Sequence, residues 1–252
     1  MRSALKAEYR KLLTVRSTYI ITALLTILVI FIASYIEGWR LNAMQLRDPT
    51  QFAGDVTGAL NITVFGAIVA ILLMTHEYRY NTIMYSLTSS NSRSKVLLSK
   101  FIVVSSYALF LAVLIGVLSP FMSSLGIHLH GHTLAPQTLH YWDLTWRSLF
   151  YAWGYGMAGF LLAALTRNQV ASIVALFLIP DLGEQLLGLL LKHNTVYLPF
   201  SSLNQVIRAG GGMGDPNSSN LSPGKAAIVY CIYLVVGGFI AWVLFLKRDA
   251  TV

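Results

Sequence analysis

The sequence predicts an all-α integral membrane protein, and three observations carry that prediction. Of its 252 residues, 56% are hydrophobic and only 11% are charged, whereas a soluble domain carries about 25% charged residues. The mean hydropathy is +0.64. Apolar stretches near membrane-spanning length recur along the whole chain, so we expect a single transmembrane domain over residues 1–252 rather than a water-soluble enzyme.

Six stretches are long and apolar enough to cross about 30 Å of hydrocarbon at roughly 1.5 Å per residue. Their predicted limits are 18–36, 58–75, 101–121, 147–165, 169–191 and 226–246. The single cysteine, Cys231, lies inside the last stretch, so we expect no intramolecular disulfide.

Residues 1–17, ahead of the first span, form a basic amphipathic pattern. A stripe with helical spacing consists of Leu5, Tyr9, Leu12 and Arg16. Lys6, Arg10 and Lys11 lie largely off this stripe, which favours an interfacial helix in the headgroup plane over a plain basic flank. The apolar run after it exceeds the roughly 7–15 residues of a signal peptide, so an uncleaved anchor is favoured.

Basic residues predict the orientation of the chain, because cytoplasmic loops hold an excess of Lys and Arg. With the N-terminus inside, twelve of the eighteen basic residues face the cytoplasm. Only Glu8, Glu77 and Asp249 among the ten acids share that side. Both termini are therefore expected in the cytoplasm. The basic residues flank apolar stretches, which favours membrane orientation over nucleic-acid binding.

The segment from His76 to Lys100 is longer than a turn between two spans needs, so we expect it to be structured. Its apolar positions with helical spacing are Ile83, Met84 and Leu87, with Asn81 or Thr82 placed to cap the helix. Asn91, Ser92 and Ser94 are expected to break that helix. The basic residues at the mouth of the third span are Arg93, Lys95 and Lys100. A solvated loop is the alternative.

Two groups of residues resemble the permease subunits of ABC-2 type transporters, which have six spans, dimerise and carry two cytoplasmic ATPase subunits. The first group is Glu8, Lys11, Leu12, Arg16 and Ser17. The second group is Glu77, Arg79, Thr82, Ile83, Leu87, Arg93 and Lys100, which is similar to the family pattern E-x-R-x-G-T-[IL]. Asn81 replaces the typical glycine, and asparagine also tolerates unusual backbone angles.

The resemblance implies a coupling helix within residues 77–100 that docks into the ATPase. The residues that it assigns to this contact are Glu77, Arg79, Thr82, Ile83, Met84, Leu87 and Arg93. The implied partners are a cytoplasmic ABC ATPase, which would bind ATP and Mg²⁺, and a second permease subunit, identical or not. No cofactor is expected in this chain, because neither the run from Gly210 to Gly214 nor Pro223-Gly224-Lys225 fits a phosphate-binding loop.

The fifth span contains Pro180, followed by Asp181 and Glu184 on one helical face. Ionisable groups at membrane depth cost roughly 2.5–3.5 kcal/mol each, so they are functional candidates. Either these acids line a translocation path, or the helix ends at Pro180 and they lie in an outer segment exposed to solvent. The ABC-2 resemblance implies short re-entrant helices on the outer side between spans five and six, where residues 192–224 fall.

Small residues with helical spacing mark the fourth span, namely Ala152, Gly156, Gly159 and Ala163. Such a seam lets another helix approach closely. It serves contacts either within the subunit, the commoner case, or between subunits of a dimer.

Four histidines lie after the third span, at His128, His130, His132 and His140. Alternating histidines would share one face of a strand and could bind Zn²⁺ or Cu²⁺. Because only Asp143 lies near enough to complete a ligand set, we expect no metal site.

The membrane topology predicts a multi-pass protein embedded among lipids, and the ABC-2 resemblance implies a permease subunit in a prokaryotic plasma membrane that exports a lipid, drug or peptide-like solute. Two alternatives stay open. One is an intramembrane enzyme that uses Asp181, Glu184 or the outer histidines. The other is an anchor or sensor with no transport cycle.

Overall fold

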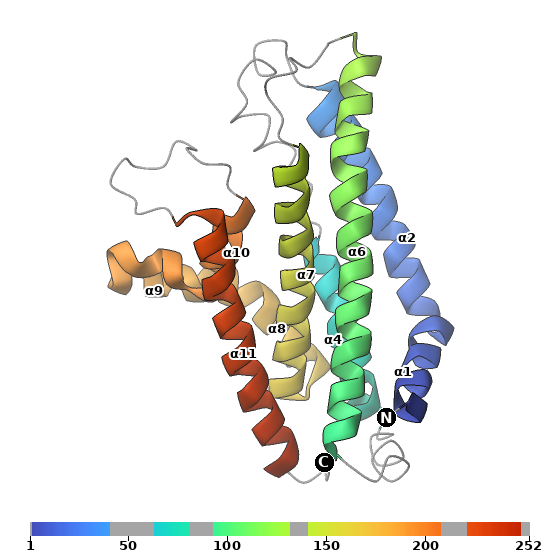
Figure 1. Cartoon of the computed structure of the whole chain (residues 1–252), viewed down its shortest axis with the longest axis vertical. Coiled ribbons are helices and arrows are strands. Elements are labelled where there is room, and N and C mark those ends of the chain that lie inside the picture. Colours follow the sequence, from blue (N-terminus) through green and yellow to red (C-terminus); the bar gives the residue numbers. More distant parts are fainter. Residues whose placement is uncertain (1, 41–62, 81–92, 132–140, 208–220, 248–252) are drawn as a thin grey trace.

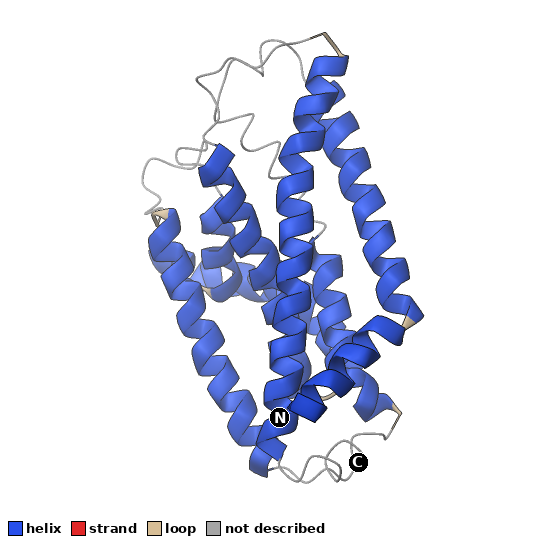
Figure 2. Ribbon diagram, turned by 45° about the vertical axis from the view of Figure 1, so that its right-hand side comes forward, coloured by secondary structure: helices blue, strands red, loops and turns tan. Residues whose placement is uncertain are grey.

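The computed structural model describes residues 2–40, 63–80, 93–131, 141–207 and 221–247, and this part of the chain is helical with no strand (Figures 1 and 2). The helices are α1 (Arg2–Thr14), α2 (Arg16–Phe31), the π-helical η1 (Ile32–Trp39), α4 (Thr63–Arg79), α6 (Arg93–Leu129), α7 (Tyr141–Thr166), α8 (Gln169–Leu178), the π-helical η4 (Ile179–Gly183), α9 (Glu184–Leu191), the 3₁₀ helix η5 (Lys192–Tyr197), α10 (Pro199–Ile207) and α11 (Pro223–Lys247).

Five helical stretches are long and apolar enough to cross a membrane. They are Thr18–Tyr35, Ser94–Leu129, Thr145–Thr166, Gln169–Leu191 and Pro223–Lys247. Each overlaps one of the predicted spans, which confirms the all-helical, multi-pass class. The predicted span at 58–75 corresponds to α4, of which 17 residues are described.

Helix α6 is much longer than the predicted span at 101–121. Its 37 residues measure about 55 Å at 1.5 Å per residue, against about 30 Å of hydrocarbon. Ser94, which the sequence predicts to end the preceding helix, lies in the first turn of α6, and Asn91 and Ser92 lie outside the described residues. Serine satisfies unpaired backbone groups at a helix start, so it favours that position as well as a loop.

Helix α7 is the centre of the bundle, and its small residues allow α4 and α6 to approach it. A Cβ at Gly156 would lie 2.7 Å from the Cβ of Ala108 on α6. A Cβ at Gly159 would lie 2.6 Å from the carbonyl oxygen of Ala67 on α4. Ala152 and Ala163 are buried on the same helix. The small-residue seam therefore serves contacts within the chain.

The fifth predicted span bends instead of ending at Pro180. Helix α8 continues through the π-helical turn η4 into α9, which runs away from the bundle (Figure 1). The wider π-helical turn accommodates the proline, which has no N–H to donate. The short helices η5 and α10 follow before α11, within the predicted region 192–224.

The predicted helix over residues 1–17 is observed as α1, separated from α2 by the extended residue Val15. Leu12 belongs to the hydrophobic core, and Leu5 and Tyr9 pack against it. The Tyr9 hydroxyl donates a hydrogen bond of 2.8 Å to the Ser106 hydroxyl on α6. The apolar stripe of α1 therefore faces the protein.

Candidate functional site

Four charged side chains meet where α1, α4 and α6 converge, and we call them the ionic quartet: Glu8, Lys11, Glu77 and Lys100. The Lys11 ammonium lies 2.8 Å from Glu8 Oε1 and also donates to Glu77 Oε1. The Lys100 ammonium lies 3.1 Å from Glu8 Oε2 and 3.2 Å from Glu77 Oε2. Each ammonium thus bridges both carboxylates, and formal charges balance within the quartet.

Most of the quartet is withdrawn from water. The side chains of Lys100, Glu77 and Glu8 are 1%, 5% and 10% exposed. An unpaired charge at such depth carries a large desolvation penalty, which pairing and hydrogen bonding must offset. Lys11 is the solvent-facing member, with 43% of its side chain exposed.

The pKa of Lys11 lies above its ordinary value of 10.5. Burial lowers this pKa, but the hydrogen bonds to Glu77 and Glu8 together with the charges of both carboxylates outweigh that effect. Lys11 is therefore an ammonium throughout the physiological range.

Local sequence explains why these groups converge. Glu8 and Lys11 are three residues apart, so they share a face of α1, and Leu12 anchors that face in the core. Glu77 lies in the last turn of α4, and Lys100 lies two turns into α6. Residues 81–92 thus join two helices that are bonded to the same ionic quartet.

Arg79 does not join the ionic quartet, although the family resemblance assigns both Arg79 and Glu77 to the contact with the ATPase. Its guanidinium donates to Gln169 Oε1 at 3.1 Å, at the start of α8, and lies 5.7 Å from the centre of the Tyr80 ring. Arg93 begins α6. The remaining predicted contact residues lie outside the described residues: Thr82, Ile83, Met84 and Leu87.

Sequence reasoning found Glu77 but did not pair Glu8, Lys11 and Lys100 with it. A signal was present, because Glu8 and Glu77 are the only acids before Asp249 on the predicted cytoplasmic side. Two carboxylates next to apolar helices require cationic partners. Lys100, one residue before the predicted third span, is the basic residue most embedded in apolar sequence.

A second basic contact, which the sequence did not reveal, closes the same end of the bundle. Arg167 donates to the carbonyl oxygen of Leu244 on α11 at 3.1 Å. Its guanidinium lies 5.6 Å from the Tyr78 ring centre and 5.4 Å from that of Phe245. Arg167 has a positive φ of 54°, and this turn between α7 and α8 directs the side chain toward both α4 and α11.

The structure separates Asp181 from Glu184. Asp181 is exposed in η4, whereas Glu184 is buried. The Glu184 carboxylate accepts hydrogen bonds of 2.6 Å from the backbone N–H groups of Phe200 and Ser201 and from the Ser201 hydroxyl. Glu184 therefore caps the N-terminus of α10, where free N–H groups and the helix dipole favour a carboxylate.

Two of the outer histidines, His128 and His130, are described, and neither lies in a strand, so they do not share the strand face that a metal site there would need. His128 lies in the last turn of α6 and His130 lies just beyond it, because the helix extends eight residues past the predicted span end. The His130 ring is 4.9 Å from the Trp39 ring, centre to centre. Among the described residues no group of three potential ligands could hold a metal. His132 and His140 lie outside them.

Comparison with known proteins adds a family. No curated protein matches the chain. The model of a family described as "Protein of unknown function (DUF2705)" matches residues 51–251, a region that includes α4 through α11. Because this match covers most of the sequence, the chain belongs to the DUF2705 family.

Proposed function

We propose that this protein is the permease subunit of an ATP-driven transporter of the ABC-2 type, driven through residues 81–92 by a separate cytoplasmic ATPase. The ionic quartet is the observation that carries this proposal. It bonds the last turn of α4 and the first turns of α6 to each other and to α1. A displacement of the connecting segment would therefore reach three helices together.

The two groups of residues that resemble ABC-2 permeases support the same proposal. Glu8 and Lys11 belong to the first group, and Glu77 and Lys100 belong to the second, 66 residues or more along the chain. Residues from both groups take part in one buried cluster. If the two short patterns resembled the family only by chance, there would be no reason for their residues to come together in one cluster.

In this proposal α4 and the residues before it complete a sixth span, and η5 and α10 form the re-entrant region on the outer side. Both termini lie in the cytoplasm of a prokaryotic cell, on the plasma membrane. Two permease subunits, identical or different, assemble with the ATPase and export a lipid, drug or peptide-like solute. ATP and Mg²⁺ bind to the ATPase, and this chain hydrolyses nothing.

The quartet gives the proposed coupling a physical basis. When the ATPase closes on ATP, it would press on the predicted apolar positions Ile83, Met84 and Leu87. Pulling Glu77 and Lys100 apart would expose poorly hydrated charges, which is costly. The ends of α4 and α6 would therefore move as one body, while the longer outer part of α6 carries the motion across the membrane.

Affinity purification of the tagged chain from its native membrane tests the proposal. We expect a nucleotide-hydrolysing protein to co-purify with the wild type, and the double variant Ile83→Asp/Leu87→Asp to lose it while still inserting. Leu129→Asp is the matched control, because Leu129 is an exposed leucine at the opposite end of α6. Retention of the hydrolase by the double variant, or the absence of any hydrolase from the wild type, would contradict the proposal.

A further inference from the structure

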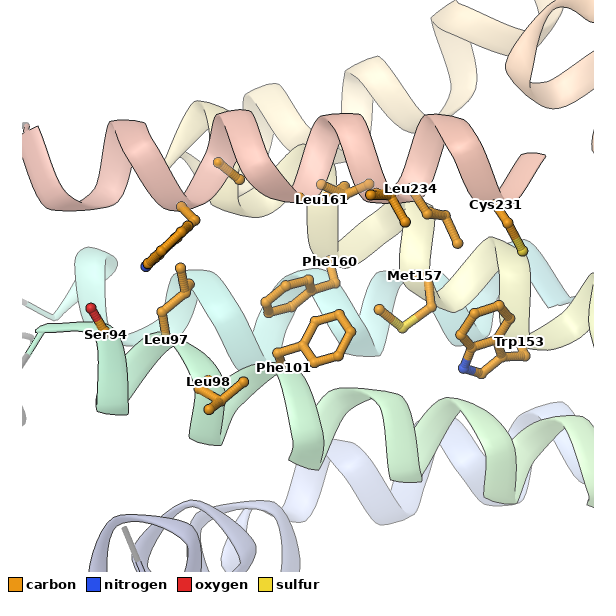
Figure 3. Close-up of a pocket in the computed structure, with 14 residues that line it drawn as sticks. Ser94, Leu97, Leu98, Phe101, Trp153, Met157, Phe160, Leu161, Cys231 and Leu234 are labelled. Atoms are coloured by element: carbon orange, nitrogen blue, oxygen red, sulfur yellow. The ribbon is translucent and has the colours of Figure 1, made fainter. Parts of the chain in front are cut away.

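An apolar cleft of about 500 Å³ separates α11 from α6 and α7 (Figure 3). Leu97, Leu98 and Phe101 line it from α6, Met157 and Phe160 line it from α7, and Leu234 belongs to its α11 wall. In Figure 3 these side chains point toward one another across the cleft. The volume falls in the range of roughly 300–1,000 Å³ that is usual for ligand sites in proteins.

The chemistry of the walls suits a hydrocarbon chain. Ligand pockets normally combine apolar walls with several placed polar groups that orient the ligand. Here the polar groups are few: Ser94 and Trp242 at one end of the cleft, and at the other the Cys231 thiol and the Trp153 indole, whose N–H already donates to Ser105 (Figure 3). A polar solute would find few partners in the cleft, whereas a chain of methylene groups would lose nothing by entering.

The length of the cleft matches one leaflet of a bilayer. Along α11 it runs from Trp242 to Cys231, which at 1.5 Å per residue is about 16 Å. This is close to half of the roughly 30 Å hydrocarbon thickness. Its Ser94 and Trp242 end lies at the end of the bundle that holds the ionic quartet, since Lys100 is only six residues from Ser94 on α6.

The charges at that end complement an anionic headgroup. Glu8 and Glu77 are neutralised within the quartet. Among the side chains that the structure describes there, all other charged groups are cations: Lys6, Arg10, Arg16, Arg79, Lys95, Arg167 and Lys247. Lys95 follows Ser94 on α6, and Lys247 ends α11 five residues beyond Trp242; both are exposed. Such long side chains reach headgroups at the membrane surface.

We propose that the cleft between α6, α7 and α11 is a binding site for one acyl chain of an anionic phospholipid from the cytoplasmic leaflet. The headgroup lies at the Ser94 and Trp242 end, within reach of Lys95 and Lys247. This site depends on the membrane orientation given under Proposed function. It does not depend on an ATPase partner or on transport, so either proposal can fail without the other.

Two glycines of α11 provide a matched pair of variants. A Cβ added at Gly238 or at Gly224 meets nothing within 4 Å, so both positions accept a β-carbon without a clash. Only Gly238 lines the cleft. Gly238→Leu should fill the cleft and keep the fold, and Gly224→Leu makes the same change on the same helix elsewhere.

Native mass spectrometry of the full chain in mild detergent measures the binding directly. With added phosphatidylglycerol we expect one retained lipid on the wild type and on Gly224→Leu, and an affinity at least roughly tenfold lower for Gly238→Leu. Phosphatidylcholine with the same acyl chains should bind more weakly than phosphatidylglycerol. Equal lipid retention by all three proteins, or no preference for the anionic lipid, would overturn the proposal.

The single cysteine supplies a second readout, because Cys231 lines the cleft. Phosphatidylglycerol should slow the alkylation of Cys231 by N-ethylmaleimide in the wild type several-fold. Protection of Cys231 from alkylation that depends on protein concentration rather than on lipid, together with a Cys231 to Cys231 cross-link, would contradict a lipid site. It would instead show that a second copy of the chain occupies the cleft.

Discussion

At the scale of single residues, Lys100 is the side chain on which the candidate coupling site depends most. It is 1% exposed, and its ammonium lies between two carboxylates from different helices. Removing one partner of a buried ion pair leaves the other charge buried and unpaired. This lowers stability by more than the intact pair contributes to it. The arrangement is thus stable only while all four groups are present.

We expect Lys100→Met to lower the free energy of unfolding by about 3–5 kcal/mol, because it leaves Glu8 and Glu77 facing each other with one cation. Lys95→Met, an exposed position on the same helix, should change it by no more than about 0.5 kcal/mol. Thermal unfolding of the purified variants measures both. Equal midpoints for Lys100→Met and Lys95→Met would show that the quartet does not hold the helices together.

The raised pKa of Lys11 predicts a stability difference at alkaline pH. A lysine whose folded-state pKa exceeds the unfolded value stabilises the fold fully below pH 10.5, and this contribution disappears as pH rises through the folded-state pKa. The difference in unfolding midpoint between the wild type and Lys11→Met should therefore be constant from pH 7 to 10 and shrink above 10.5. A difference that grows with pH would contradict the ion pairing.

At the scale of helices, two features hold elements together that the sequence alone did not relate. Glu184 on α9 caps α10 through three hydrogen bonds, although Phe200 and Ser201, its partners, lie 16 and 17 residues further along the chain. Gly159 on α7 lets the backbone of α4 approach to the distance at which any side chain would clash.

Glu184→Gln should destabilise the protein by about 1–3 kcal/mol, since an amide oxygen replaces a carboxylate that satisfies two backbone N–H groups. Asp181→Asn, at an exposed position three residues away, should leave stability unchanged. Unfolding midpoints and protease sensitivity around α10 measure the difference. If Asp181→Asn alters transport without altering stability, Asp181 lines a translocation path. Equal destabilisation by Asp181→Asn and Glu184→Gln would contradict the capping role of Glu184.

Gly159→Ala should cost about 1–3 kcal/mol, because the new Cβ would lie 2.6 Å from a backbone oxygen that cannot rotate away. Gly238→Ala is the control, since its Cβ meets nothing within 4 Å and alanine favours a helix. Comparison of the two unfolding midpoints checks the prediction. A Gly159→Ala protein as stable as Gly238→Ala would mean that α4 and α7 are not closely packed.

The sequence predicted the helices better than it predicted the contacts between them. Hydropathy located five membrane-length helices because burial in lipid requires long apolar runs. It underestimated α6, because polar residues at helix ends carry no hydropathy signal although the helix continues through them. Glu8, Lys11 and Lys100 escaped pairing for a different reason. Contacts between different helices, such as Lys11 with Glu77 and Lys100 with Glu8, depend on how the helices pack, which periodicity along one helix does not report.

At the scale of the whole molecule, the two ends of the bundle differ in charge. The start of α1 and the end of α11 lie at the same end as the junction between α4 and α6 (Figures 1 and 2). That end holds the quartet and an excess of exposed cations. The distribution of basic residues predicts that this is the cytoplasmic end, which the proposed coupling to a cytoplasmic ATPase requires.

The side of the membrane on which residues 81–92 lie tests this account most directly. Cysteines introduced by Ser90→Cys and, as an outer control, Asn217→Cys, each in a Cys231→Ala background, are treated in intact cells with a membrane-impermeant maleimide. We predict that Asn217→Cys reacts at once and that Ser90→Cys reacts only after the membrane is permeabilised. Reaction of Ser90→Cys in intact cells would place the connecting segment outside, beyond the reach of any cytoplasmic ATPase, and would contradict the proposed coupling.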